Sequence, residues 1–127
     1  MESKIIQKYA KYSQPQLIKK AQIVFNKFIR ERDADQPCIN CGNYRKLQAG
    51  HFYAAGKYSA LRFDEDNVFG ECLHCNYFNS QSHAQGYAVN IIKRIGEERV
   101  NLLNQKAKKT AFKWDRFSLI EIIERYK

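Results

Sequence analysis

Two short stretches, Cys38-Ile39-Asn40-Cys41-Gly42 and Cys72-Leu73-His74-Cys75-Asn76, decide how this chain folds. Each begins with a Cys-x-x-Cys pair, and 30 residues separate the two pairs. Such a pair forms a tight turn that presents two thiolates to one ion, and Gly42 can take the left-handed conformation that this turn needs. Two such turns supply the four sulfurs of a closed, structural zinc site. We therefore predict a zinc ion bound by Cys38, Cys41, Cys72 and Cys75.

The composition is that of a globular protein. The 127 residues are enough for one domain and too few for two ordinary ones. Hydrophobic residues make up 44% and charged residues 28% of the chain. No apolar run is long enough to cross a bilayer, and the first residues lack the apolar stretch of a signal peptide. We expect a cytoplasmic protein, in which paired cysteines bind metal more often than they form disulfides or a redox site.

Positive charge is concentrated on both sides of the cysteine-bounded centre. The chain has 22 Lys and Arg against 13 Asp and Glu, a net charge of +9. Residues 38–75 are neutral, so the excess lies in residues 1–37 and 76–127. A basic protein of this size commonly binds nucleic acid, although a solvated lysine-rich surface has the same composition. Charge alone also says nothing of sequence specificity, because phosphate contacts do not read bases.

Hydrophobic periodicity predicts helices on both sides of a short hairpin. Apolar residues repeat at helical spacing from Leu17 to Ile29, which predicts a helix over about 15–32 with a basic outer face. The centre has no helical period, and Leu47–Tyr53 and Leu61–Gly70 favour an irregular hairpin. A helix after the second cysteine pair is expected to end at Gly96, and its inner face would be Ala84, Ala88, Ile91, Ile92 and Ile95. Another short helix is expected over Glu97–Gln105. A last helix is expected to begin at a Ser118–Glu121 capping box with a Phe117–Ile122 staple, and to bury Leu119, Ile120, Ile123 and Tyr126.

The residues between and after the cysteine pairs carry a family resemblance. The order is Cys-x-x-Cys, His51, Asn67, then Cys-x-x-Cys followed at once by Asn76. This order resembles the HNH, or ββα-metal, nucleases in their four-cysteine treble-clef form, including phage endonuclease VII. The similarity is greater to the NinG/Rap recombination proteins of lambda-like phages. It is carried by these segments: Phe28-Ile29-Arg30-Glu31-Arg32-Asp33, Cys38–Gly42, Ala49-Gly50-His51-Phe52, Leu61–Asn67, Cys72–Asn76 and Ile91–Gly96.

The resemblance implies a site for phosphodiester cleavage. His51 would be the general base, because imidazole accepts a proton from water near neutral pH. Asn76 would bind a catalytic Mg²⁺ or Mn²⁺ ion, which stabilises the charge of the transition state and the departing 3′ oxygen. Asn67 would position His51 by hydrogen bonding. Many relatives in the wider superfamily place Asp or His directly before the general base, as a second ligand, and here that residue is Gly50.

The missing ligand leaves three alternatives open. Asn76 binds the ion alone with water, a second ligand comes from His83 or Asn79, or the site has become a binding module without catalysis. Tyr and Phe residues near the first knuckle are expected either to stack on unpaired bases or to form a small core beside the zinc. They are Tyr44, Phe52, Tyr53, Tyr58 and Phe63.

Taken together, the sequence predicts a small α+β protein with a treble-clef HNH zinc core flanked by helices. The single domain would comprise a basic helical arm (1–35), the zinc core (36–96) and C-terminal helices (97–127). The expected function is metal-dependent cleavage of branched DNA, such as Holliday junctions, in phage recombination inside the host cytoplasm. A resolvase cuts two strands symmetrically, so a homodimer is expected, with helices 15–32 and 84–105 as possible interfaces. The alternatives are a non-catalytic zinc module that binds DNA and an HNH nuclease that cuts linear duplexes.

Overall fold

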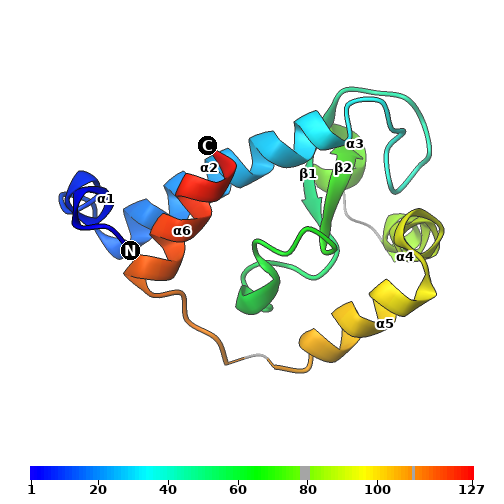
Figure 1. Cartoon of the computed structure of the whole chain (residues 1–127). Coiled ribbons are helices and arrows are strands. Elements are labelled where there is room, and N and C mark those ends of the chain that lie inside the picture. Colours follow the sequence, from blue (N-terminus) through cyan, green and yellow to red (C-terminus); the bar gives the residue numbers. More distant parts are fainter. Residues whose placement is uncertain (78–80, 110) are drawn as a thin grey trace.

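A computed structural model describes residues 1–77, 81–109 and 111–127, except for the side chains of residues 81–83. Within these residues the chain is mostly helical, with one two-stranded antiparallel sheet. The fold class is therefore α+β, as predicted (Figure 1). In chain order the elements are α1 (Ser3–Lys8), α2 (Gln14–Arg32), β1 (Leu47–His51), a turn of 3₁₀ helix (Ser59–Leu61), β2 (Val68–Cys72), α3 (Leu73–Tyr77), α4 (Gln81–Ile95), α5 (Glu97–Lys106) and α6 (Arg116–Tyr126).

The β1–β2 hairpin stands between two groups of helices. Helices α1, α2 and α6 lie on one side of it, and α4 and α5 lie on the other (Figure 1). Val68 and Phe69 are neighbours in β2 and point to opposite faces, as successive residues of a strand do. Val68 packs in a cluster with α2 and α6, whereas Phe69 packs in a second cluster with α4 and α5. The hairpin thus joins two hydrophobic cores, and its own end carries the cysteines.

Helix α2 forms where its apolar pattern predicts. Leu17, Ala21, Phe25 and Ile29 are fully buried, at 0% exposure, and they face α6 and the hairpin. Ser13 caps the first turn, because its hydroxyl accepts from Gln16 N while the Gln16 side chain accepts from Ser13 N. This reciprocal pair satisfies two backbone donors that a helix start otherwise leaves open.

Two details of the later helices differ from expectation. The capping box at Ser118 is wrong: α6 begins three residues earlier, where the Asp115 carboxylate accepts from Ser118 N. Phe117 is 53% exposed, so it forms no staple. The buried residues of α6 include Leu119, Ile120 and Ile123, as predicted.

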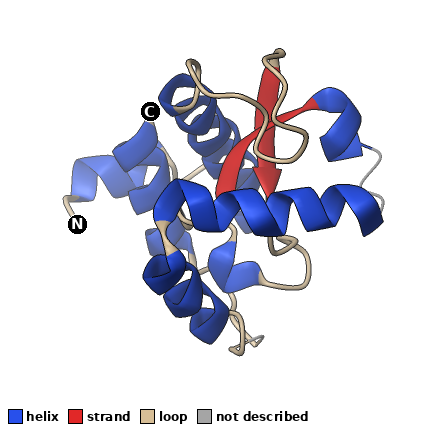
Figure 2. Cartoon of the chain, turned by 90° about the vertical axis from the view of Figure 1, so that its right-hand side faces the viewer, coloured by secondary structure: helices blue, strands red, loops and turns tan. Residues whose placement is uncertain are grey.

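The inner face of α4 is also rotated from the expected one. Ile91 is buried and Ile95 packs against the same cluster, as predicted. Ala84 and Ile92 are exposed instead, and Tyr87 is buried. The cause is a polar contact, since the Tyr87 hydroxyl donates to Gly50 O at 2.6 Å and accepts from Phe69 N at 3.2 Å. This hydroxyl joins the two strands and fixes α4 to the hairpin. Figure 2 shows the helix crossing in front of the strands.

Helix boundaries at glycine agree with the prediction. Gly96 has a φ of +89° and separates α4 from α5.

None of the described helices combines the length and the apolar character that a membrane span requires.

Candidate functional site

The four cysteines meet at the end of the hairpin. Their Sγ atoms all lie within 4.8 Å of one another, and Cys41 Sγ is 3.9 Å from Cys72 Sγ. In a tetrahedral zinc site with Zn–S bonds of about 2.3 Å, neighbouring sulfurs are roughly 3.8 Å apart. Gly42 closes the first knuckle with a φ of +75°, the conformation expected of it. The cluster therefore fits a structural zinc ion.

Burial of the cysteines changes their protonation, and so affects metal binding. Burial raises the pKa of the Cys38 and Cys75 thiols above the ordinary value. A metal ion has to displace these protons, because zinc binds the thiolate. Backbone amides already point at the sulfurs, since Asn40 N and Cys72 N donate to Cys38 Sγ at 3.4 and 3.3 Å.

His51 is the last residue of β1, and a backbone carbonyl orients its ring. Its Nε2 lies 2.9 Å from Arg62 O. A carbonyl oxygen only accepts hydrogen bonds, so this contact places the proton of neutral His51 on Nε2 and leaves the Nδ1 lone pair as an acceptor. Burial, and secondarily the charge of Arg62, lower the pKa of His51 below 6.5, against the opposing effect of its hydrogen bond to Arg62 O. The neutral imidazole that a general base requires is thus favoured at neutral pH.

Asn67 is fully buried, at 0% exposure, at the base of the loop between the strands. Its Oδ1 accepts from Tyr53 N at 2.8 Å, and its Nδ2 donates to Tyr53 O and Leu61 O, both at 3.0 Å. These described bonds reach the loop rather than the imidazole of His51. Leu61 immediately precedes Arg62, so Asn67 holds the loop next to the carbonyl that contacts His51. The resemblance implies a hydrogen bond from Asn67 to His51, and the described bonds of Asn67 do not include one.

Asn76 lies in α3, directly after the last cysteine, and is exposed. Its Nδ2 donates to Gln48 Oε1 at 3.0 Å. This bond uses the nitrogen side of the amide, so the other side presents Oδ1, which is an oxygen ligand for a hard cation.

A buried carboxylate occupies the same face of the hairpin as Gln48. Glu71 is opposite Gln48 in the register and is only 4% exposed. Asn40, between the first two cysteines, donates from Nδ2 to Glu71 Oε2 at 2.7 Å. The sequence analysis did not single out Glu71. The available signal was an acidic residue inside a strand, but only the cross-strand register reveals that it adjoins Gly50.

The segments that carry the family resemblance also converge on a second buried acid, Asp33. Its carboxylate accepts from Gly70 N at 2.8 Å and pairs with Arg32 at 2.8 Å and Arg94 at 3.9 Å. Arg32 donates further to Val68 O at 2.7 Å. This cluster ties the end of α2 to β2 and α4, and so fixes the hairpin relative to both groups of helices.

Comparison with known proteins supports the resemblance. Residues 2–127 match the family described as Bacteriophage Lambda NinG protein. The chain belongs to this family. A relative named Protein ninG from Escherichia phage 933W is 45% identical over 86 residues, which cover 66% of this chain and 42% of that protein. The Protein ninG of Escherichia phage lambda is 44% identical over the same shares, and that of Salmonella phage P22 is 42% identical over 94 residues, or 72% of this chain and 46% of the relative.

The chain spans less than half the length of these NinG relatives. No solved structure shows a significant match to it.

The two other candidates for a second metal ligand lie outside the described residues. Asn79 lies in the undescribed segment 78–80, and the side chain of His83 is among those left out.

The aromatic residues near the first knuckle mostly form a core. Phe52, Tyr53 and Tyr58 pack against the cluster that contains Tyr87, and Phe63 is buried against α2. Only Tyr44, at 78% exposure, is openly available for stacking.

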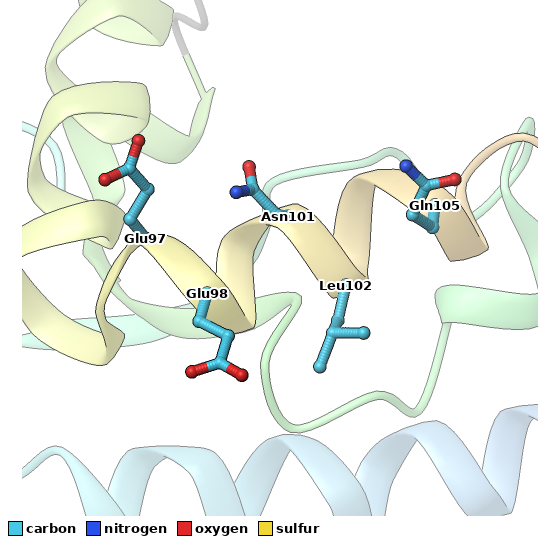
Figure 3. A pocket seen from close by; sticks show the side chains of 5 residues that line it. All are labelled: Glu97, Glu98, Asn101, Leu102 and Gln105. Atoms are coloured by element: carbon cyan, nitrogen blue, oxygen red, sulfur yellow. The ribbon is translucent and has the colours of Figure 1, made fainter.

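Hollows in the described surface lie beside the first knuckle, where Cys38 and Gly42 line one of about 360 Å³, and along the helices. One, of about 510 Å³, follows α5, where Glu98 and Leu102 point to one side and Glu97, Asn101 and Gln105 to the other (Figure 3). Its carboxylates suit a polyanion poorly. A second hollow of about 510 Å³ between α1, α2 and α6 is bordered by Lys8, Lys11, Lys20 and Lys127.

Proposed function

We propose that this protein is a metal-dependent endonuclease that cleaves branched DNA, such as Holliday junctions, during phage recombination. The observation that carries the proposal is His51, whose Nε2 is held by Arg62 O at the end of a hairpin anchored by four cysteines. An orienting carbonyl and a lowered pKa are what a neutral general base needs.

The order of elements supports an HNH interpretation of this region. A hairpin carries His51 at the end of its first strand, and its second strand leads into a helix that carries Asn76. Cys72 ends β2 and Cys75 lies in α3, so the cluster joins this helix and the hairpin to the first knuckle. We take this strand–strand–helix unit as the treble-clef ββα-metal core.

The proposed reaction is hydrolysis of one phosphodiester bond. Water bound at Nδ1 of His51 loses a proton to the ring as its oxygen attacks phosphorus. The bond from phosphorus to the 3′ oxygen breaks, and that oxygen takes a proton from solvent. His51 then releases its proton to solvent, which returns the base to its starting form. A divalent ion, when bound, neutralises charge on the phosphate and the leaving oxygen.

The residues near Asn76 fit such an ion. The Asn76 amide is exposed and is oriented by Gln48, and Mg²⁺ and Mn²⁺ prefer oxygen ligands of this kind. Mg²⁺ also retains several waters, so few protein ligands suffice.

The charge distribution supports DNA as the partner. The net charge is +9, and four lysines border the hollow between α1, α2 and α6. Since two strands of a junction must be cut symmetrically, we propose that the enzyme acts as a homodimer. The apolar face of α2 is used within the chain, so exposed Val89, Ile92 and Leu102 on α4 and α5 are the better candidates for an interface.

The test is cleavage of a labelled four-way junction beside a linear duplex of matched sequence. Each substrate is incubated with zinc-loaded protein in Mg²⁺, in Mn²⁺ and in EDTA. His51→Ala is compared with His74→Ala, which alters the exposed histidine of the second knuckle. Zinc content and thermal unfolding are measured for both variants.

The expected result is metal-dependent cutting of the junction that His51→Ala lowers by about 100-fold or more, while His74→Ala retains it. Equal cutting of both substrates would replace the resolvase with a duplex nuclease. Tight junction binding without cutting in either metal would show a binding module instead.

A further inference from the structure

Many relatives in the wider superfamily carry a second metal ligand at the position of Gly50. In this protein a side chain from the opposite strand, Glu71, occupies the space beside Gly50. We propose that Glu71 supplies the carboxylate for the divalent ion, in place of the side chain that Gly50 lacks. This inference rests on the proposed function and assigns a ligand of its site. The ion would lie between Glu71 and Asn76, on the face of the hairpin that carries Gln48.

The register of the hairpin puts these groups on one face. Gln48 pairs with Glu71, and Gly50 pairs with Phe69. Residues two apart in a strand share a face, so positions 48 and 50 of β1 adjoin positions 69 and 71 of β2. Directly opposite side chains have Cβ atoms about 4.5–5.5 Å apart, which places Glu71 beside Gln48, the side chain that accepts from Asn76.

The space beside Gly50 shows that one carboxylate fits there. A Cβ atom added to Gly50 would lie 2.2 Å from Glu71 Oε1 and 2.8 Å from Glu71 Cβ. Both distances are far below ordinary contact. A ligand at position 50 and Glu71 therefore exclude each other, and the Glu71 carboxylate stands where a side chain at position 50 would begin.

The two oxygens of Glu71 have different surroundings. Oε2 accepts the Asn40 amide at 2.7 Å, whereas Oε1 is the atom over Gly50. Asn40 is 5% exposed, and its Oδ1 has no hydrogen-bond partner in the described part of the chain. The bond to Glu71 therefore orients this amide, and it holds the carboxylate with Oε1 toward Gly50.

The donor set suits a hard divalent ion. A carboxylate oxygen from Glu71 and an amide oxygen from Asn76, with water at the other positions, form the oxygen-rich, incompletely enclosed shell that Mg²⁺ and Mn²⁺ accept. A buried carboxylate also gains from a nearby cation, because its charge is costly to remove from water. The ion would neutralise that charge.

The test measures Mn²⁺ binding to the zinc-loaded full chain by calorimetry and by the spin-resonance signal of free Mn²⁺. Mn²⁺ competes poorly with zinc for the cysteines. Glu71→Gln keeps an oxygen for Asn40 and removes the charge, and Glu98→Gln on the exposed surface of α5 is the matched control. A swap, Gly50→Asp with Glu71→Gly, moves the carboxylate to β1 and removes the collision.

We expect Glu71→Gln to weaken Mn²⁺ binding by about tenfold or more, Glu98→Gln to leave it unchanged, and the swap to restore most of the loss. Unchanged affinity in zinc-loaded Glu71→Gln, or no Mn²⁺ binding by the parent protein, would overturn the inference. If Glu71→Gln loses zinc or unfolds, the swap decides: a folded swap protein that binds Mn²⁺ supports the inference, and one that does not overturns it.

The readout separates this inference from the proposed function. Mn²⁺ binding that depends on Glu71, in a protein that cuts no DNA, would leave the ion site standing and remove the nuclease. Cutting that depends on His51, with Mn²⁺ binding indifferent to Glu71, would do the reverse.

Discussion

A backbone carbonyl orients the ring of His51, and burial lowers its pKa. Arg62 O fixes the proton on Nε2, and Asn67 fixes the loop that presents this carbonyl. The histidine and the two asparagines could be picked out from the sequence by their order relative to the cysteines. Their partners could not, because a carbonyl eleven residues away has no residue type to recognise.

The lowered pKa of His51 predicts the pH dependence of cleavage. Burial keeps the folded pKa below 6.5, so the neutral base persists to lower pH than in a free histidine. We expect single-turnover rates, measured across about pH 5 to 8, to show an acidic limb centred below pH 6.5. An acidic limb centred above that pH would contradict the assignment.

The same shift has a consequence for stability. An unfolded chain protonates His51 at higher pH than the folded chain does, so protonation favours unfolding. The contribution of neutral His51 is therefore fully present above pH 6.5 and is lost as the pH falls through the folded pKa. His51→Ala should lose this part of the pH dependence of unfolding.

At the residue scale, Glu71 is a functional candidate that the local sequence did not predict. The zinc ligands were predicted because their chemistry is encoded in a fixed spacing of one residue type. Glu71 is a functional candidate only by virtue of its position diagonal to Gly50 across the hairpin. That relation depends on register, which the loop between the strands sets and which no short motif records.

At the scale of elements, the end of α2 is where this helix is joined to β2 and α4. Asp33 follows the last residue of the helix and bonds to β2 through Gly70 N, and to Arg32 and Arg94 through ion pairs. It is 4% exposed, so these contacts are shielded from water.

Replacing Asp33 should weaken this junction measurably. Asp33→Ala leaves Gly70 N without its acceptor and two arginines without their carboxylate. We expect the free energy of unfolding to fall by about 2–3 kcal/mol, measured by urea denaturation of the zinc-loaded protein. Asp35→Ala, which removes an exposed carboxylate two residues later, is the control and should change stability little. Equal effects of the two substitutions would count against the role of Asp33.

Helix prediction succeeded where the apolar pattern was strong. It failed where polar contacts set the start or the buried face of a helix. The bounds of α2 and the break at Gly96 follow from spacing and from glycine. The start of α6 was misplaced because Asp115 and Ser118 are both good capping residues, and only the structure shows which one caps. The face of α4 was misjudged because the Tyr87 hydroxyl bonds to the hairpin.

At the scale of the whole molecule, the cysteine cluster holds one end of the hairpin that joins the two cores. Residues of the cluster come from the first knuckle, from β2 and from α3. Binding of structural zinc is worth about 10–16 kcal/mol in small zinc-binding peptides, which is comparable to the whole stability of an ordinary domain, about 5–15 kcal/mol.

Removing zinc should therefore unfold much of the chain. After treatment with a strong chelator, we expect loss of the cooperative thermal transition in circular dichroism, and its return when Zn²⁺ is added back. Metal analysis must show that the chelated sample has lost its zinc. An unchanged transition in such a sample would show that the cluster is not needed for the fold.

The pairing of α2 with α6 also dictates an order of events during synthesis. The chain emerges from the ribosome from its N-terminus, at about 5–20 residues per second in bacteria. All four cysteines have been made by residue 75, whereas α6 begins at Arg116. The knuckles can therefore capture their ion while Leu17, Phe25 and Ile29 still await the helix that covers them. The metal-bound centre is the part that a nascent chain can complete first, and the helical half closes only after the last turn of α6 has left the ribosome.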